Sequence, residues 1–213
     1  WVMDDDCIPT EGALKALETC VVANQGKKLG FLSSYVAFKD GSTCISNAPG
    51  PFHLWLNGFS SSNHGSGYVQ LAWATFVSCL VSREAIESVG YPVKEFFIWG
   101  DDIEFTTRVS GLYPCYFVPQ SLVYHLPAEN RPNTYNHVND HSLWKFKYAM
   151  RNVVAFIRTT QPQGVLRAFN YWRGAFKEMR LGKVKKTHML ILFREWFKGL
   201  FFNYTKLIKK VGK

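Results

Sequence analysis

Residues 76–109 read FVSCLVSREAIESVGYPVKEFFIWGDDIEFTTRV, and this stretch indicates the fold. It begins inside an apolar, β-favouring run over residues 68–81, and residues 82–90 then predict a short helix with a serine cap and a terminal glycine. A second apolar run at residues 96–99 predicts another buried strand, and residues 101–109 predict another helix. Strands that alternate with short helices are typical of an α/β fold.

The pattern continues toward the N-terminus. Residues 1–3 form a short apolar run that ends at three aspartates, which predicts a buried parallel strand. Residues 10–23 predict a helix capped by its threonine. Residues 29–46 contain a Lys-Asp-Gly-Ser turn between two predicted strands, and residues 47–67 have the composition of a loop. The expected apolar stripe of the helix comprises Leu14, Leu17 and Val21.

Toward the C-terminus, residues 115–118 and 121–125 predict two short strands, and from Ser142 onward the pattern is helical. We therefore predict an α/β body with a mixed sheet and flanking helices over residues 1–141. A basic α-helical tail is expected over residues 142–213.

Composition narrows the class of protein. Hydrophobic residues make up 47% of the chain and charged residues 19%, which favours a folded core over disorder. The five cysteines lack CxxC spacing and are typical of reduced core residues. Residues 1–142 contain 8 Lys and Arg against 14 Asp and Glu, whereas residues 143–213 contain 17 against 2. This asymmetry indicates an anionic partner for the tail.

Three carboxylates follow the first predicted strand. In an extended segment Asp4 and Asp6 point to the same side, so they can offer oxygen ligands to Mg²⁺ or Mn²⁺. A solvated acidic turn or a helix N-cap cluster is the alternative interpretation.

A second acidic cluster comprises Asp101, Asp102 and Glu104 at the start of a predicted helix, where the helix dipole favours ionised carboxylates. One of them can act as a general base, although acidic residues are also common in first helical turns. His125 ends a predicted strand and is a candidate third metal ligand, although a histidine in this position can also be structural. We expect these strand ends to converge on one crevice.

These motifs together resemble the family 2 glycosyltransferases of the GT-A fold, and among them the bacterial rhamnosyl- and galactofuranosyltransferase-like members. VMDDD at residues 2–6 is similar to the DxD motif of the family, and residues 76–109 are similar to its base-bearing segment. LVYH at 122–125 resembles the histidine-ending strand, and FKYAMRNVVAFIR at 146–158 resembles the following Tyr-x-x-Arg-Asn helix. The family carries further strands and the nucleotide-base pocket before its DxD strand, so we expect a partial GT-A (Rossmann-like) sheet that is incomplete at its N-terminus.

The resemblance implies an inverting, metal-dependent transfer of a sugar from a nucleotide-sugar donor. Asp4 and Asp6 would bind Mg²⁺ or Mn²⁺ with His125 as third ligand, and Asp5 would lie beside the ribose or diphosphate. Asp102 would be the base that deprotonates the acceptor hydroxyl.

The acceptor is expected to be a glycan or a lipid-linked glycan of cell-surface polysaccharide synthesis. Asp101 and Glu104 are its candidate contacts, and Trp99 and Trp73 are candidate platforms for sugar rings, with a core role as the alternative for Trp73.

Residues 188–211 of the tail predict one amphipathic helix. We expect it to bind the anionic inner face of the cell membrane, with packing on the catalytic body or on a second subunit as the alternative. The expected apolar stripe comprises Met189, Phe193, Trp196, Leu200, Tyr204, Leu207 and Val211, with Arg194, Lys198, Lys206, Lys209 and Lys210 on or near the other side.

Parts of the sequence are also compatible with two other functions. Gly-Asp-Asp at residues 100–102 is also found in viral RNA polymerases, but here it opens a predicted helix and the chain is short for a polymerase. The other rival is a non-catalytic module that binds a membrane or nucleic acid; the glycosyltransferase interpretation includes no nucleic-acid partner.

Overall fold

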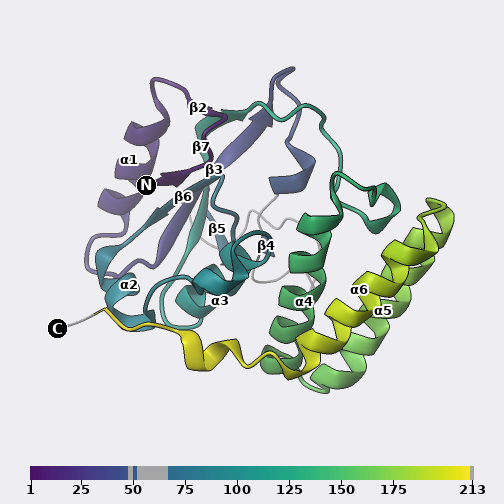
Figure 1. Cartoon of the computed structure of the whole chain (residues 1–213). Helices are drawn as coiled ribbons and strands as arrows, with labels where there is room; N and C mark the ends of the chain where they lie inside the picture. The colour runs from purple at the N-terminus through teal and green to yellow at the C-terminus, as the bar shows by residue number, and fades with distance from the viewer. Residues whose placement is uncertain (48–49, 52–66, 212–213) are drawn as a thin grey trace. The chain divides into compact units, whose positions relative to one another are not determined.

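The computed structural model describes residues 1–47, 50–51 and 67–211 (Figure 1). The chain forms two compact units. Unit 1 contains Trp1–Tyr91, Asp102–Pro132 and Lys209–Lys213, and unit 2 contains Pro92–Asp101 and Asn133–Ile208. The expected division after residue 141 falls within unit 2.

Unit 1 is built around a mixed β-sheet with strand order β1-β6-β3-β7-β5-β4. β3 and β7 pair in parallel, the other described pairs are antiparallel, and β2 pairs with the end of β7. The predicted mixed α/β fold is therefore confirmed. The strands are β1 (Val2–Met3), β2 (Cys7–Pro9), β3 (Phe31–Phe38), β4 (Gly50–Pro51), β5 (Val69–Trp73), β6 (Ser78–Val81) and β7 (Tyr116–His125).

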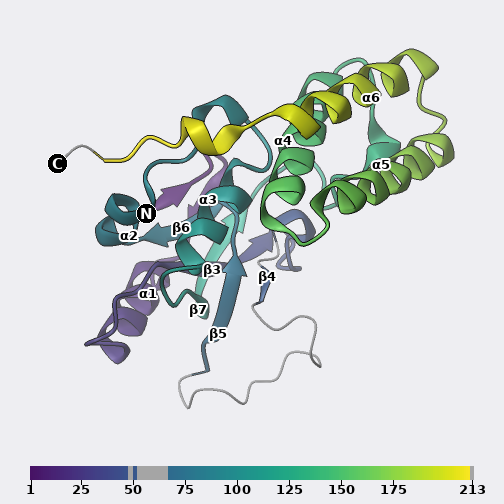
Figure 2. The same cartoon turned by 90° about the horizontal axis from the view of Figure 1, so that it is seen from below.

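Helices cover both faces of this sheet (Figure 2). They are α1 (Ala13–Ala23), α2 (Arg83–Val89) and α3 (Asp101–Ser110). Neighbouring residues of β3 point to opposite faces, as the alternation of a strand requires. Phe31 packs in a cluster with residues of α2 and α3, whereas Leu32 packs with residues of α1.

The capping prediction for α2 is confirmed. Ser82 is extended and its hydroxyl accepts a hydrogen bond from the Ala85 amide, which satisfies one of the free N–H groups of the first turn. Gly90 follows the helix at a φ of 83°, in the left-handed region that favours glycine.

The N-cap prediction for α1 is wrong. The helix begins at Ala13, and the Thr10 hydroxyl instead donates to the Leu122 carbonyl oxygen at 3.0 Å, beside the β2–β7 pair. The buried residues of α1 are Ala13, Leu17 and Cys20, whereas Leu14 and Val21 of the predicted stripe are exposed.

Two strand predictions near the sheet edge are corrected. β1 pairs antiparallel with β6 rather than in parallel, and Val2 is 45% exposed rather than buried. The run at residues 68–81 divides into β5 and β6, because the Thr106 hydroxyl bonds to both the amide and the carbonyl oxygen of Ala74 and so ends the ladder there.

The two short strands predicted at residues 115–118 and 121–125 are one strand, β7. Its register against β3 shifts after Ser34, so residues 119–121 form a bulge. The Ser121 hydroxyl in the bulge shares a 2.7 Å hydrogen bond with that of Ser34, which accepts another from Ser78. These buried hydroxyls hold the strand together across the irregular register.

After β3 the predicted turn is present but the second strand of the hairpin is not. The Phe38 amide donates to the Ser42 carbonyl oxygen at 2.7 Å, and Gly41 has a φ of 85°. Beyond it the structure has one bridge between Ala37 and Thr43 and a 3-10 turn, η1 (Ile45–Asn47). The loop predicted at residues 47–67 lies mostly outside the described residues.

Unit 2 is helical, as predicted from Ser142 onward. Its elements are α4 (Leu143–Thr160), α5 (Gly164–Leu181) and α6 (Lys186–Phe201), with 3-10 turns η2 (Lys94–Phe96), η3 (Tyr135–His137) and η4 (Tyr204–Leu207). The three helices share a core that includes Met150, Met179 and Leu192. The single helix predicted over residues 188–211 is wrong, because α6 ends at Phe201.

The strand predicted at residues 96–99 is also absent. Phe97 and Trp99 both have a φ of 60°, which is incompatible with a strand. The Asn152 side-chain amide donates to the carbonyl oxygens of Phe96, Ile98 and Trp99 at 2.9, 3.3 and 2.9 Å. Side-chain hydrogen bonds thus replace a ladder in this segment.

Among the described residues, no helix has both the length and the apolar character needed to cross a membrane.

Candidate functional site

The three aspartates lie in a turn between β1 and β2. The Cys7 amide donates to the Asp4 carbonyl oxygen at 3.2 Å, so the segment turns rather than continuing extended as expected. Cys7 pairs with His125, and the Leu126 amide donates to the Asp6 carbonyl oxygen at 3.0 Å. These contacts fix the aspartate turn against the end of β7.

The turn brings two carboxylates to the imidazole of His125. Its Nε2 lies 3.1 Å from Asp6 Oδ1 and 4.0 Å from Asp4 Oδ2. The His125 side chain is only 10% exposed, whereas those of Asp4 and Asp6 are 50% and 43% exposed. The imidazole is therefore largely buried, and the carboxylates are partly open to solvent. Asp5 is exposed in the same turn.

Asn47 holds the other nitrogen of this imidazole. His125 Nδ1 lies 2.8 Å from Asn47 Oδ1, which also accepts from the Cys44 thiol at 3.1 Å. Because a carbonyl oxygen can only accept, Nδ1 must carry a proton, and a neutral His125 then presents the Nε2 lone pair to the carboxylates. Such an arrangement is repulsive unless a proton or a metal cation lies between the groups.

The donor set fits a divalent cation. Neighbouring ligands of an octahedral Mg²⁺ or Mn²⁺ site lie about 3 Å apart when the bonds are about 2.1 Å long. Asp6 Oδ1 and His125 Nε2 are 3.1 Å apart. Cys7 completes a group with Asp6 and His125 whose ligand atoms lie within 4.8 Å of one another. Burial and the nearby Asp4 raise the pKa of the Cys7 thiol to about 12.

Asp102 lies at the start of α3, in unit 1. Its Oδ1 accepts from the Ile103 amide at 2.7 Å. Burial raises the pKa of the Cys79 thiol, and the charge of Asp102 raises it further. Cys79 lies in β6 and pairs with Val2 of β1.

Glu104 does not suit the predicted role as an acceptor contact. It is 1% exposed, and both of its oxygens bind Arg108, at 2.6 and 3.0 Å. Arg108 in turn donates to the carbonyl oxygens of Val89 and Tyr91. Glu104 therefore ties α3 to the end of α2, and its carboxylate faces away from solvent.

The other predicted acceptor residues occupy separate settings. In unit 2, Trp99 packs edge-on against Phe146 with ring centroids 5.0 Å apart, and Asp101 opens α3. In unit 1, Trp73 is half-buried at the end of β5, opposite Gly50. Asn47 was not among the predicted site residues, and its partner lies 78 residues away along the chain. Asn152 belongs to the Tyr-x-x-Arg-Asn segment, but no role was predicted for it, and its partners lie up to 56 residues away.

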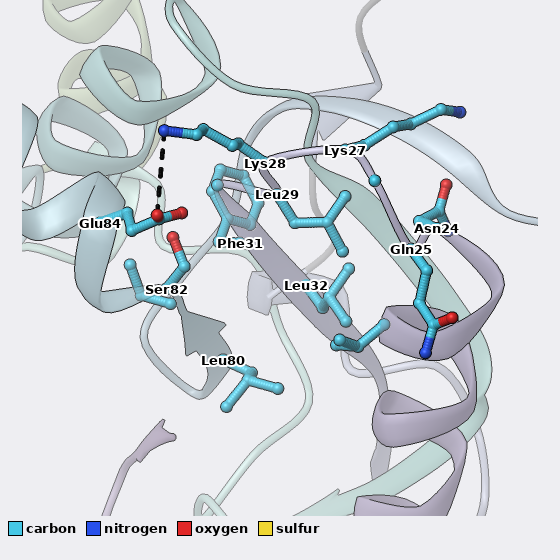
Figure 3. Close-up of a pocket in the computed structure, with 14 residues that line it drawn as sticks. Asn24, Gln25, Lys27, Lys28, Leu29, Phe31, Leu32, Leu80, Ser82 and Glu84 are labelled. Atoms are coloured by element: carbon cyan, nitrogen blue, oxygen red, sulfur yellow. Dashed lines mark ion pairs between the residues drawn. The ribbon is translucent and has the colours of Figure 1, made fainter.

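The close-up in Figure 3 shows a different cavity of unit 1, of about 540 Å³. It is bordered by the end of α1, the start of β3 and the end of β6. An ion pair between Lys28 and Glu84, 3.9 Å long, crosses its rim. His125 pairs with Phe38 at the far end of β3, and none of the candidate site residues lines this cavity.

No model of a known protein family matches the chain, and no curated protein matches it. The functional assignment therefore depends on the geometry and chemistry of the site.

Proposed function

We propose that the chain is the catalytic part of an inverting glycosyltransferase that depends on a divalent metal and uses a nucleotide-sugar donor. The observation that carries this proposal is the placement of Asp4 and Asp6 at 4.0 and 3.1 Å from His125 Nε2. The resemblance of the sequence motifs to family 2 glycosyltransferases supports it. The chemistry that a bound Mg²⁺ or Mn²⁺ supplies is neutralisation of the charge on the leaving nucleoside diphosphate.

The residues divide into two roles. Asp4, Asp6 and His125 hold the cation, and Asp5 in the same exposed turn faces the ribose or diphosphate of the donor. Asp102 takes the proton of the acceptor hydroxyl as that oxygen attacks the anomeric carbon, and the bond from this carbon to the diphosphate oxygen breaks. The N-terminus of α3 stabilises the ionised form of Asp102 before it accepts the proton.

The acceptor in this proposal is a glycan or lipid-linked glycan of cell-surface polysaccharide synthesis. Asp101 and Trp99 remain its proposed contacts, with Trp73 as a further candidate, whereas Glu104 is assigned to the structural pair with Arg108. Lipid-linked acceptors place the activity at the inner face of the cell membrane, to which the protein binds peripherally.

Calorimetry tests the metal and donor parts of the proposal. Mn²⁺ is titrated into the protein, and UDP, GDP and dTDP are then titrated in the presence and absence of Mn²⁺. We expect at least one nucleotide to bind only with Mn²⁺. Asp6→Asn should weaken Mn²⁺ binding, whereas Glu18→Gln, an exposed carboxylate of α1, should not. Nucleotide binding that is independent of Mn²⁺, or equal Mn²⁺ affinities for both variants, contradicts the proposal.

Turnover tests the base. With a panel of nucleotide-sugar donors that match the bound nucleotide, Asp102→Asn should abolish transfer and leave the affinity for the nucleoside diphosphate nearly unchanged. Transfer at the wild-type rate excludes Asp102 as the base.

A further inference from the structure

Helix α5 carries an apolar stripe that faces solvent. Val165, Phe169, Trp172 and Phe176 follow one another at intervals of four, three and four residues, so they lie along one side of the helix. Val165, Phe169 and Phe176 are 63%, 47% and 39% exposed. The core of unit 2 takes the neighbouring side of α5, where Ala168, Ala175 and Met179 are buried, and Trp172 at the edge of the stripe packs against this core.

Helix α6 carries a second stripe of the same kind. Leu190, Phe193, Phe197 and Phe201 recur at intervals of three, four and four residues and are between 42% and 71% exposed. The two helices lie side by side within unit 2 (Figures 1 and 2), and the Trp172 and Phe193 rings meet edge to face with centroids 5.2 Å apart. The two stripes therefore join into one surface, which we call the aromatic face.

The aromatic face differs from the stripe that the sequence predicts. Trp196 and Leu200 of that stripe pack against the core of unit 2, and Tyr204 is 2% exposed beyond the end of α6. The exposed apolar residues are instead shared between α5 and α6. The aromatic face includes five exposed phenylalanines, and an exposed apolar patch of this kind is typical of a surface that binds a partner.

Exposed charge around the aromatic face is positive. Residues 164–201 contain nine Lys and Arg and only two acidic residues, Glu178 and Glu195. Both acidic residues are engaged inside unit 2, because Glu178 accepts from the Tyr135 amide at 2.8 Å and Glu195 is 8% exposed beside Lys198. Their charges are therefore not presented to a partner.

Arginines border the stripes on both helices. Arg173 lies four residues after Phe169, Arg180 four residues after Phe176, and Arg194 four residues after Leu190, and all three arginines are exposed. On a helix this spacing places each guanidinium beside the apolar stripe. Aromatic rings flanked by cations match the boundary of an anionic lipid bilayer, where rings enter the acyl region and guanidinium groups meet phosphates.

We propose that the aromatic face of α5 and α6 docks the protein on an anionic membrane surface. The helices lie in the plane of the interface, with the phenylalanines among the acyl chains and Arg173, Arg180 and Arg194 at the headgroup phosphates. This inference rests on the membrane location proposed above and names the surface that provides it. It does not depend on glycosyl transfer.

Vesicle co-sedimentation tests the proposal with the full chain. Vesicles contain either phosphatidylcholine alone or phosphatidylcholine with 30% phosphatidylglycerol. We expect the wild type to bind the anionic vesicles. The partition coefficients of Phe193→Ser/Phe197→Ser and of Arg173→Glu/Arg194→Glu should be lower by a factor of about ten or more. The control variants are Leu112→Ser, an exposed leucine of unit 1, and Lys15→Glu/Lys27→Glu, and both should bind as the wild type does.

Three results would overturn the proposal. The first is equal sedimentation of the wild type and the phenylalanine variant. The second is a lipid-free dimer, measured by light scattering, that the phenylalanine variant dissociates, because the face would then bind a second copy. The third is that the wild type binds RNA and the arginine variant does not, while both variants bind vesicles as the wild type does. Mn²⁺ calorimetry of the phenylalanine variant should match the wild type, so failure of the docking and failure of the metal site are distinguishable.

Discussion

The hydrogen bond from His125 Nδ1 to Asn47 Oδ1 determines which ring nitrogen faces the carboxylates. The same Asn47 oxygen accepts from the Cys44 thiol, so it is fixed by two donors. A partner of this kind sets the tautomer and the ring orientation of a metal-binding histidine. Asn47 is therefore a positioning residue of the candidate metal site.

Replacing Asn47 by leucine should weaken Mn²⁺ binding by roughly 10- to 100-fold, because loss of such a partner frees the imidazole to change tautomer and rotate. Asn47→Asp keeps an acceptor oxygen in the same place and should retain most of the affinity. Calorimetry with Mn²⁺ alone measures both variants. Wild-type affinity for Asn47→Leu would show that the ring is held by its packing instead.

At the residue scale, the sequence indicated the principal candidates because they occupy strand ends. Asp4, Asp6 and His125 follow apolar runs, and such ends meet at one edge of a sheet. Asn47 could not be found in this way, because it lies in a 3-10 turn outside any periodic pattern and its partner is 78 residues away. Glu104 was a candidate because it belongs to the acidic cluster at the start of a predicted helix, but it pairs with Arg108 one helical turn further along the chain.

Among the helices, close approach of α4 and α6 depends on Gly199. A Cβ atom at this position would lie 2.7 Å from the Arg151 carbonyl oxygen and 2.8 Å from Val154 side-chain atoms. Among the described residues, apart from the chain neighbours of Gly174 and the backbone of α5 around it, no atom lies within 4 Å of the corresponding point at Gly174. Gly174 is therefore a suitable control position for Gly199 in the same helical unit.

Gly199→Ala should lower the free energy of unfolding by about 1–3 kcal/mol, because the backbones of α4 and α6 must separate. Gly174→Ala should raise it by up to about 1 kcal/mol, because alanine favours the helix and meets open space. Chemical denaturation followed by circular dichroism measures both changes. Equal effects of the two substitutions would contradict the close approach.

Tyr135 and Tyr171 make unit 2 sensitive to alkaline pH. Their hydroxyls share a 2.9 Å hydrogen bond, and burial raises the pKa of Tyr171 to about 12 and that of Tyr135 well above its usual value. The fold therefore holds both phenols neutral. Their contribution to stability is complete below pH 10, the usual tyrosine pKa, and is lost as pH rises toward the folded values.

For Tyr171 the difference between a pKa of about 12 and one of about 10 corresponds to about 3 kcal/mol. We expect the free energy of unfolding to fall between pH 9.5 and pH 11.5, and to fall less steeply in Tyr171→Phe. Tyr91→Phe, which replaces an exposed tyrosine, should follow the wild type. Denaturant titrations at several pH values measure the slopes, and identical slopes in all three proteins would refute the assignment.

At the scale of the elements, the sequence pattern correctly predicted those helix ends that are set by local interactions. Ser82 and Gly90 bound α2 through groups within three or four residues, and the sequence shows both. The segment at residues 96–99 was wrongly predicted as a strand because its carbonyl groups bind Asn152, more than fifty residues away. The ends of β5 and of α6 are likewise set by contacts or backbone angles that no local period reveals.

At the scale of the whole molecule, the two units differ in net charge. Unit 1 contains ten Lys and Arg against eleven Asp and Glu, whereas unit 2 contains fifteen against five. The asymmetry seen along the sequence therefore corresponds to a nearly neutral unit that carries the candidate metal site and a basic unit that carries the aromatic face. A substitution in one unit can therefore test the function of that unit while the function of the other unit serves as the control.

Mn²⁺ should stabilise unit 1 selectively if Asp4, Asp6 and His125 bind it, because a ligand stabilises whatever native structure it binds. At a free concentration of 100 times the dissociation constant the gain is about 2.7 kcal/mol. Hydrogen exchange followed by mass spectrometry should show added protection in peptides that cover the aspartate turn and the end of β7, and none in α5 or α6. Asp6→Asn should remove the protection and Glu18→Gln should keep it. Protection confined to unit 2 would mean that the cation binds elsewhere, since the ligands proposed here all belong to unit 1.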